Sequence, residues 1–383
     1  MSYQLISVQS SPGSNFMNAT IRQTVMVSQA VDKIRLEISN AFGGTDLSIS
    51  AISIARPIDQ TSGSNEIEAN SSTKLTFSNS ESFTVPVGAI ALSDAVDFHV
   101  DSQSIVTISM YLERGQDTDA ITSHPGSRTT SHFVSGDHVE ALHFEDSVSA
   151  EHWYFISALE GFFETTHSAI AIIGDSITDG RGSTTNGNDR WPDLFLDRLQ
   201  KDISTSSLAI VNQAAGGNRV LADDLGPSVM SRVERDVVAH PGVKYAIVYE
   251  GINDIGTGAV DEASQGIIGD RLIQAYQQVI SRLQRHAILV YGATMTPIGG
   301  EGQPYDHPNR EATRQRVNNW IRSNDQFDAV IDFDSAVRDP DNPTQLLADY
   351  DTGDHLHLNP KGLAALADSI DIGLFTRSAS NAF

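Results

Sequence analysis

Near its middle the chain reads Ala169-Ile170-Ala171-Ile172-Ile173-Gly174-Asp175-Ser176-Ile177-Thr178-Asp179-Gly180. An apolar run followed at once by turn residues is typical of a buried parallel strand, and loops that leave the carboxyl ends of such strands form the ligand crevice of an open α/β sheet. This position allows Ser176 to act as a nucleophile. Asp175 or Ser176 can also serve only as the cap of the next helix, which is the commoner reason for these residue types there.

Apolar runs of the same kind recur toward the carboxyl end and alternate with segments of helical period. They lie at 208–211, 245–249, 288–291 and 330–333. Strands that alternate with amphipathic helices predict βαβ units and a parallel sheet. We therefore expect an α/β domain over residues 166–383, with Trp191 and Trp320 packed in its core rather than presented to a ligand.

The amino-terminal part has a different pattern, in which short alternating runs are separated by Ser, Gly, Asn, Asp and Pro. Residues 33–39, 47–54 and 104–112 alternate with the period of two that a half-buried strand requires. Turn residues recur at the intervals of a sandwich. We expect an all-β sandwich domain of jelly-roll type over residues 1–165, with the junction between residues 160 and 167.

The composition excludes several kinds of partner and chemistry. The chain has 25 Lys and Arg against 49 Asp and Glu, a formal net charge of -24, so no basic face is available for nucleic acid or an anionic membrane surface. It has no cysteine, which excludes thiol nucleophiles, thiolate metal sites and disulfides. No window approaches the ~20 apolar residues of a membrane-spanning helix.

The first residues lack the basic and apolar segments of a signal peptide, so the chain is expected to be either intracellular or a mature secreted form. Asn18 and Asn70 lie in sequons that would be usable in a eukaryotic secretory route. Of the two compartments, we expect the mature secreted form over the cytoplasmic one. The sequence indicates no oligomeric state.

A base for the serine is found near the carboxyl end. A serine hydroxyl needs a base within about 2.6 to 3.2 Å, and that base needs a carboxylate or carbonyl to orient it. The segment Asp354-His355-Leu356-His357 can supply both. The spacing of three lets Asp354 reach the Nδ1-H of His357 and direct its Nε2 toward Ser176.

Donors for an oxyanion follow two other predicted strands. An ester carbonyl that is attacked develops negative charge on its oxygen, which needs hydrogen-bond donors already in place. Gly217, in the cluster after the second predicted strand, can offer an unobstructed backbone N-H. Asn253, in Gly251-Ile252-Asn253-Asp254, can offer a side-chain NH2 group, and Ser176 its own N-H.

The clusters around these residues resemble, in order, the sequence blocks of the SGNH (GDSL) hydrolase superfamily, whose name lists serine, glycine, asparagine and histidine. The resemblance covers roughly residues 168–377. It implies a flavodoxin-like three-layer α/β/α hydrolase domain with a parallel sheet, which requires no metal and no other cofactor. It implies a triad of Ser176, Asp354 and His357, and an oxyanion hole of Ser176, Gly217 and Asn253.

The second block departs from the usual pattern. Ala214-Ala215 replace the Gly-aliphatic pair that is often seen, and adjacent Gly216 and Gly217 leave the position of the donor open by one residue, with Gly217 preferred. The amino-terminal half also resembles the β-sandwich that precedes the hydrolase domain in some bacterial and fungal members, including carbohydrate acetyl esterases. Ser39-Asn40-Ala41-Phe42-Gly43 and His124-Pro125-Gly126 carry that resemblance.

Three further residues are candidate substrate contacts, each with an alternative role. Asp175 can cap a helix, Arg219 can form a surface ion pair, and His355 can line the pocket wall or have no role. The two histidines of the last block share one side of an extended segment and would suit a metal pair, but no third ligand is visible, so we expect no metal. Asp179 and Asp254 can support the site, or bond local backbone N-H groups as aspartates at loop ends usually do.

These residues favour a serine esterase that forms an acyl-enzyme on Ser176. We expect short acyl esters, acetyl groups above all, on a small molecule or a polysaccharide, because the sandwich half can orient a glycan and no apolar lid helix for lipid is evident. Lipase or thioesterase activity is the alternative within the same chemistry. A second alternative is a non-catalytic carbohydrate-binding protein on the same fold, since fold alone does not prove activity.

Overall fold

A computed structural model of the chain describes residues 4–6, 14–163 and 166–377. Its described residues divide into two compact units. The first, here called the β unit, includes the described residues up to 163 together with 185–188, and the second, the α/β unit, includes the rest. The junction predicted between residues 160 and 167 includes residues 164 and 165, which lie outside the described residues.

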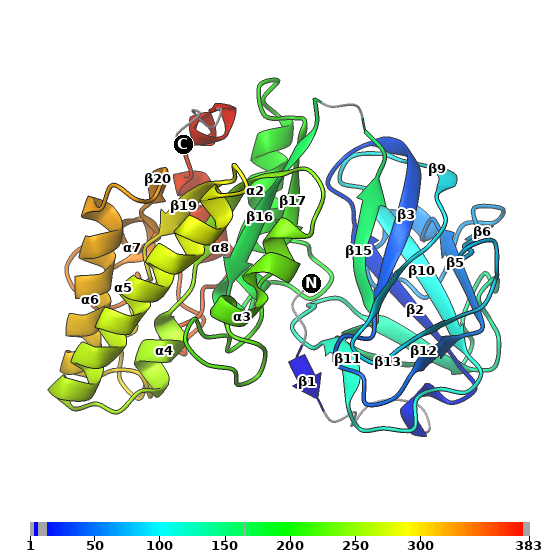
Figure 1. Ribbon diagram of the computed structural model, residues 1–383, viewed down its shortest axis with the longest axis horizontal. Coiled ribbons are helices and arrows are strands. Elements are labelled where there is room, and N and C mark those ends of the chain that lie inside the picture. The colour runs from blue at the N-terminus through cyan, green and yellow to red at the C-terminus, as the bar shows by residue number, and fades with distance from the viewer. Residues whose placement is uncertain (1–3, 7–13, 164–165, 378–383) are drawn as a thin grey trace. The chain divides into compact units, whose positions relative to one another are not determined.

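The β unit is built from antiparallel strands (Figure 1). In the described residues these are β1 (Gln4–Ile6), β2 (Ala19–Met26), β3 (Val31–Ser39), β4 (Leu47–Ile49), β5 (Ala51–Ala55), β6 (Thr73–Lys74), β7 (Phe83–Val85), β8 (Ile90–Leu92), β9 (Val96–Val100), β10 (Ile105–Leu112), β11 (Ile121–His124), β12 (Ser131–Ser135), β13 (Val148–Ala150), β14 (Trp153–Tyr154) and β15 (Ile156–Gly161). One sheet has the order β13-β12-β2-β10-β5-β6, and another has the order β15-β3-β8 with β9 also paired to β3. Ile21, Leu36, Ile54, Ile108 and Phe133 belong to one shared core between them. This multi-sheet arrangement matches the predicted sandwich.

One strand prediction in this unit is wrong. Residues 47–54 were expected to form a single strand, but the structure divides them at Ser50, so that β4 pairs with β7 and β5 pairs with β10. Ser50 donates its backbone N-H to Tyr111 O, and its hydroxyl accepts from the backbone N-H of Glu113. The alternating pattern continues across the break, so the pattern alone could not reveal it.

The α/β unit has a five-stranded parallel sheet in the order β17-β16-β18-β19-β20. Its strands are β16 (Ser168–Gly174), β17 (Leu208–Asn212), β18 (Val243–Tyr249), β19 (Leu289–Ala293) and β20 (Ala329–Ile331). Its helices in the described residues are α1 (Ser176–Asp179), α2 (Trp191–Gln200), α3 (Val229–Val233), α4 (Ile252–Thr257), α5 (Glu262–Gln284), α6 (Pro308–Ser323), α7 (Phe333–Val337) and α8 (Pro360–Ser369). Numbered along the chain, the strand order is 2-1-3-4-5, which is the flavodoxin-like doubly wound order that was predicted.

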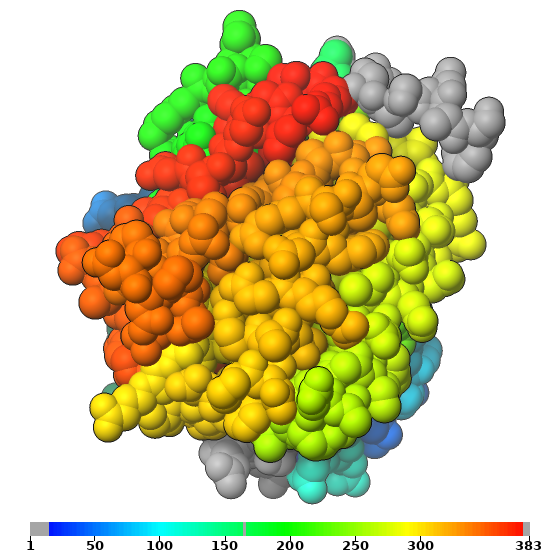
Figure 2. All heavy atoms as spheres, turned by 90° about the vertical axis from the view of Figure 1, so that its left-hand side faces the viewer, coloured from blue at the N-terminus to red at the C-terminus, as the bar shows by residue number. Residues whose placement is uncertain are grey.

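Alternate residues of the central strand enter two different cores. On β16, Ile170 and Ile172 pack with residues of α2, α7 and α8, whereas Ala171 and Ile173 pack with residues of α3, α5 and α6. The sheet therefore has helices on both faces, as the three-layer prediction requires (Figure 1). In the space-filling view of one side, the α5 and α6 segments lie next to one another (Figure 2).

The predicted core and strand ends agree with the structure in most places. Trp191 is fully buried, and Trp320 is partly buried against the α5–α6 core, so both tryptophans pack as expected. The predicted strand 330–333 is too long, because β20 ends at Ile331 and Asp332 caps α7 by accepting from the backbone N-H of Ser335. No helix in the described part of the chain has the length and apolar character needed to cross a bilayer.

The strand register brings the loops with the predicted site residues to one edge of the sheet. Gly174 at the end of β16 pairs with Tyr249 at the end of β18, and Ile172 pairs with Asn212 at the end of β17. Because the strands are parallel, the loops that follow them leave from neighbouring points. This edge is where the candidate site is found.

Candidate active site

Ser176 is the first residue of α1, directly after the turn that follows β16. The side chain of Asp175 caps this short helix by accepting the backbone N-H of Ile177 at 2.9 Å. The helix ends after one turn at Gly180, whose φ of 95° is a left-handed conformation that favours glycine. The loop, strand and cap together place the Ser176 hydroxyl at the positive end of a helix.

The structure brings Ser176 and the two predicted triad partners into contact. Ser176 Oγ lies 2.8 Å from His357 Nε2, and His357 Nδ1 lies 2.6 Å from Asp354 Oδ2. The other Asp354 oxygen accepts the backbone N-H groups of Leu356 and His357, so the carboxylate is held on the turn that also carries the imidazole. The arrangement has the geometry that a serine hydrolase triad requires of its nucleophile, base and orienting acid.

The electrostatics of the turn keep Asp354 ionised. Partial burial favours a higher pKa, but the backbone N-H and ring of His357, together with the N-H of Leu356, outweigh it and lower the pKa of Asp354 to about 2. Arg181 adds a distant ion pair, with its guanidinium 3.9 Å from Asp354 Oδ2. An ionised carboxylate can stabilise the positive charge that His357 acquires when it takes a proton.

The sequence left open whether Gly216 or Gly217 is the oxyanion donor. One hydrogen bond in the structure bears on this choice. Gly216 donates its backbone N-H to Asp179 Oδ2 at 3.0 Å. Within the described residues the N-H of Gly217 meets no acceptor, and its φ of 70° is again a left-handed conformation. The structure therefore leaves Gly217, the residue that was preferred, with the donor available for an oxyanion.

Asn253 lies in the first turn of α4, beside the glycine loop. Its Nδ2 donates to Asn218 O at 2.9 Å, and its Oδ1 accepts from the Tyr305 hydroxyl at 3.0 Å. An amide nitrogen carries two hydrogens, so the second remains for another acceptor. The structure thus brings the predicted donors Gly217 and Asn253 to neighbouring elements.

Two aspartates accept hydrogen bonds from backbone N-H groups of the segment around Gly217. Asp254 accepts the backbone N-H groups of Val220 and Leu221 at 2.8 and 2.9 Å, and Asp179 accepts that of Gly216. Burial raises the pKa of Asp254 to about 6 against the effect of these two bonds. The backbone groups are far away in sequence, so the usual rule that such aspartates bond local N-H groups does not describe these two.

Asp175, a candidate substrate contact, is buried. Only 2% of it is exposed, and burial, opposed by its bond to Ile177 and reinforced by the charges of Asp179 and Asp254, raises the pKa of Asp175 to about 7. The structure shows its alternative role, that of a helix cap, while its contact with substrate stays a prediction. Glu250, directly after β18, is a second buried acid near it, and burial raises the pKa of its carboxyl well above the usual range.

Arg219 and His355 each have a partner on their own loop. The Arg219 guanidinium donates to Asp223 O at 2.9 Å and lies 3.3 Å from the Asp224 carboxylate, so it forms the ion pair given as its alternative. His355 Nδ1 lies 2.6 Å from Asp351 Oδ2. The chain is not extended at His355, whose φ is 60°, so the premise that both histidines share one side of an extended segment is wrong. No three His, Asp or Glu side chains of the described chain group closely enough to hold a metal ion.

Sequence reasoning missed three residues at this site. Tyr305 bonds Asn253, Gln303 donates to Asp354 O at 2.6 Å, and the exposed Leu225 lies beside Gly217, where an added Cβ would come within 2.6 Å of its side chain. All three lie in loops that carry no recognisable motif. Only their proximity to the predicted site residues in the folded chain reveals them.

A comparison with known families shows to which family the chain belongs. The family model of GDSL-like lipases and acylhydrolases matches residues 172–365, just over half of the chain. The chain belongs to this family. It is therefore a carboxylic ester hydrolase of the GDSL-like acylhydrolases, as the blocks around Ser176 and His357 led us to expect. No curated protein matches the chain.

Solved structures of other hydrolases match this one at low identity. A GDSL-like lipase from Bacteroides thetaiotaomicron is 14% identical, with 55% of this chain and 90% of that chain covered and a TM-score of 0.40. An acetylxylan esterase from Geobacillus stearothermophilus is 20% identical, with 53% of this chain and 91% of that chain covered and a TM-score of 0.39.

Proposed function

We propose that this GDSL-like hydrolase cleaves short-chain acyl esters, acetyl esters of carbohydrate above all, through an acyl-enzyme on Ser176. The observation that carries the proposal is the 2.8 Å contact between Ser176 Oγ and His357 Nε2. These residues are 181 positions apart in the chain, so the fold alone brings them together. A hydrogen bond of this length lets the imidazole take the hydroxyl proton as the oxygen attacks.

In the first step, Ser176 Oγ bonds to the acyl carbon while its proton passes to His357 Nε2. Asp354 holds the ring and stabilises the imidazolium. The carbonyl oxygen becomes an oxyanion, which accepts from the backbone N-H groups of Ser176 and Gly217 and from the amide of Asn253. The ester C-O bond then breaks, and His357 gives its proton to the departing alcohol.

In the second step, water releases the acyl group. His357 takes a proton from the water as its oxygen bonds to the acyl carbon, and a second oxyanion forms in the same place. When this intermediate collapses, Ser176 Oγ leaves and regains a proton from His357. One ester and one water thus give one alcohol and one carboxylic acid, and the enzyme returns to its starting state.

Support for a carbohydrate substrate comes from the β unit by itself. Residues of β9 and of the turn into β10 border a hollow of about 370 Å³. Arg56, Gln60, His99 and Asp101 are among its lining residues, and their side chains can hydrogen-bond sugar hydroxyl groups. Arg56 lies over the Phe98 ring, 4.8 Å from its centroid, which restricts the guanidinium.

One observation favours the second candidate, an acylhydrolase for longer chains. Leu225 is 54% exposed and lies beside Gly217, one of the residues that would surround the reacting carbonyl. An exposed apolar side chain there can bury part of an acyl chain and so stabilise a longer substrate. The acyl length at which turnover is fastest distinguishes the two candidates.

The experiment is a p-nitrophenyl ester series from acetate to octanoate, with acetate release from acetylated xylan measured in parallel. A steep preference for acetate together with deacetylation of xylan supports the proposal, whereas faster turnover of octanoate favours the second candidate. Ser176→Ala should lower kcat more than ~10³-fold on every ester. Equal rates in Ser176→Ala and wild type would rule out the acyl-enzyme.

A control addresses the hollow of the β unit. Arg56→Ala should weaken the binding of acetylated xylan while the hydrolysis of p-nitrophenyl acetate keeps its rate, because that small ester needs only the triad. Unchanged xylan binding would remove the support that the hollow gives to a carbohydrate substrate.

A further inference from the structure

The loop after β19 makes contacts with two separate parts of the candidate active site. Tyr305 bonds the side chain of Asn253, and Gln303 donates from Nε2 to Asp354 O at 2.6 Å. Gln303 Oε1 in turn accepts the backbone N-H of Tyr305 at 3.0 Å, so the two contacts are linked. One loop thus joins the oxyanion side of the site to the triad side.

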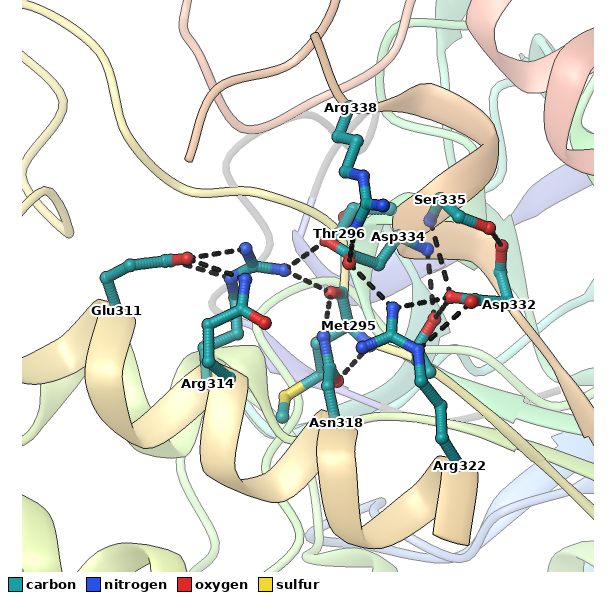
Figure 3. Close-up of polar contacts among 12 residues, drawn as sticks. Met295, Thr296, Glu311, Arg314, Asn318, Arg322, Asp332, Asp334, Ser335 and Arg338 are labelled. Carbon is teal, nitrogen blue, oxygen red and sulfur yellow. Dashed lines mark hydrogen bonds and ion pairs between the residues drawn. The ribbon is translucent and has the colours of Figure 1, made fainter. Parts of the chain in front are cut away.

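The base of this loop is fixed by α6. Figure 3 shows Arg314 and Asn318 of that helix directed at Met295, close after β19. Arg314 Nη1 donates to Met295 O at 2.6 Å, while Asn318 accepts from Met295 N and donates to Met295 O, both at 2.8 Å. A backbone unit held through both its N-H and its C=O has little freedom to shift.

A buried carboxylate secures this arrangement. Asp334, in α7, is fully buried and pairs with Arg314 at 2.6 Å, Arg322 at 2.7 Å and Arg338 at 3.1 Å (Figure 3). Removing one partner of such a buried pair is strongly destabilising, because a charge is left without compensation. The loop therefore starts from a rigid position.

Tyr305 packs closely against the helix that carries Asn253. A Cβ added at Gly256, one turn along α4, would lie 2.2 Å from the Tyr305 ring, so the ring lies directly on the helix backbone. Burial, reinforced by the charge of Asp175, raises the pKa of the Tyr305 hydroxyl. The hydroxyl accordingly keeps its proton at neutral pH and can donate it.

The two bonds to the Asn253 side chain determine which way its amide faces. Tyr305 donates to Oδ1, and Nδ2 donates one of its hydrogens to Asn218 O. Exchanging the two ends of the amide would place Nδ2 opposite the Tyr305 donor and Oδ1 opposite the Asn218 carbonyl, and both contacts would be repulsive. The second Nδ2 hydrogen is therefore held in one direction.

We propose that Tyr305 is a positioning residue that, through its hydroxyl, holds the Asn253 amide in the orientation that donates to the oxyanion. This inference rests on the proposed function, because it takes Asn253 as an oxyanion donor. The Tyr305 hydroxyl makes no contact with the reacting atoms, and acts only through the amide. It also draws electron density from that amide, since a donor on Oδ1 strengthens the N-H groups of the same amide.

The test is Tyr305→Phe, which removes one oxygen and keeps the ring on Gly256. We expect kcat for p-nitrophenyl acetate to fall about 3- to 10-fold with KM unchanged, since the amide is held by one hydrogen bond fewer and the oxyanion that it would serve forms only on the way through the transition state. Tyr245→Phe is the matched control. This variant likewise loses a tyrosine hydroxyl, one that donates to the backbone carbonyls of Phe375 and Arg377 at the opposite end of the sheet from the site. It should keep kcat.

A double-mutant cycle with Asn253→Ala separates positioning from a general effect on structure. In the Asn253→Ala background, Tyr305→Phe should have no further effect on kcat, because no amide remains to be held. An equal loss in both backgrounds, or a loss confined to KM, would overturn the proposal. If Asn253→Ala itself keeps full kcat, the oxyanion role in the proposed function fails, and the role of Tyr305 fails with it. Thermal unfolding of each variant confirms that the fold is retained.

Discussion

Two carboxylate–imidazole pairs occupy one short segment before α8, and they differ in what lies beyond the ring. In both pairs the carboxylate oxygen is 2.6 Å from Nδ1: Asp354 with His357, and Asp351 with His355. Beyond the first ring lies the Ser176 hydroxyl, and the His357 side chain is 5% exposed. The second ring lies against Gly300, and its side chain is 37% exposed.

The comparison teaches that an oriented imidazole is not sufficient for nucleophilic chemistry. Both aspartates hold the Nδ1 side of a ring, and the Asp351 carboxylate also accepts the backbone N-H groups of Gly353 and His355. The pair that would react differs in having the Ser176 hydroxyl at its ring and in the deeper burial of that ring. The same substitution made in each pair therefore shows, through the loss of kcat, how much the effect of a histidine or an aspartate depends on the serine beside it.

The largest expected difference is between the two histidines. His357→Gln should lower kcat for p-nitrophenyl acetate on the order of 10⁴-fold, because the serine loses its base. His355→Gln should lower it less than about tenfold, and a change confined to KM would show that its ring touches substrate. Steady-state kinetics on both variants give the answer. Similar losses of kcat would contradict the distinction between the pairs.

The next difference is between the two aspartates. Asp354→Asn keeps the shape but presents the wrong charge and an altered partner for the Nδ1-H of His357, so kcat should fall about 10³-fold. Asp351→Asn should have a much smaller effect on kcat, since its ring has no serine to activate. The same assay, with thermal unfolding as a check on folding, compares them. A larger loss for Asp351→Asn would reverse the assignment.

The smallest expected effect is on the pH dependence of the unfolding free energy, through Glu250. It has to be known before a pH profile of the two pairs can be interpreted. The buried Glu250 has a raised pKa, and neither of its carboxyl oxygens has a hydrogen-bond partner in the described structure. A group whose folded pKa exceeds the unfolded value of about 4.3 contributes stability that is present below that value and is lost as pH rises toward the folded pKa. The wild type should therefore lose stability as pH rises from about 4.3 toward the raised pKa of the Glu250 carboxyl.

Glu250→Gln removes this ionisation. The slope of the unfolding free energy against pH should become shallower by about 1.4 kcal/mol per pH unit over that range. Urea unfolding at several pH values measures the slope, and kcat at neutral pH is the control. An unchanged slope would show that Glu250 does not titrate differently in the folded state.

Much of the fold and the site follows from sequence because the informative residues are close together. The run before Ser176, the alternation of strands and helices, and the spacing of Asp354 and His357 each depend on neighbours in the chain. The choice between Gly216 and Gly217 does not, because it depends on Asp179, 37 positions away. Tyr305 is 52 positions from Asn253 and lies in a loop whose path no periodicity describes.

The ion pairs of Asp334, which fix the base of the loop after β19, affect how the site responds to rising temperature. Taking charged groups out of water becomes less costly as temperature rises, whereas the stabilisation from each buried apolar surface levels off. The ion pairs between Asp334 and its arginines thus continue to stabilise the loop at temperatures where the stabilisation from apolar contacts no longer increases. On warming, the alignment of the catalytic groups should therefore persist until the surrounding hydrophobic layers melt.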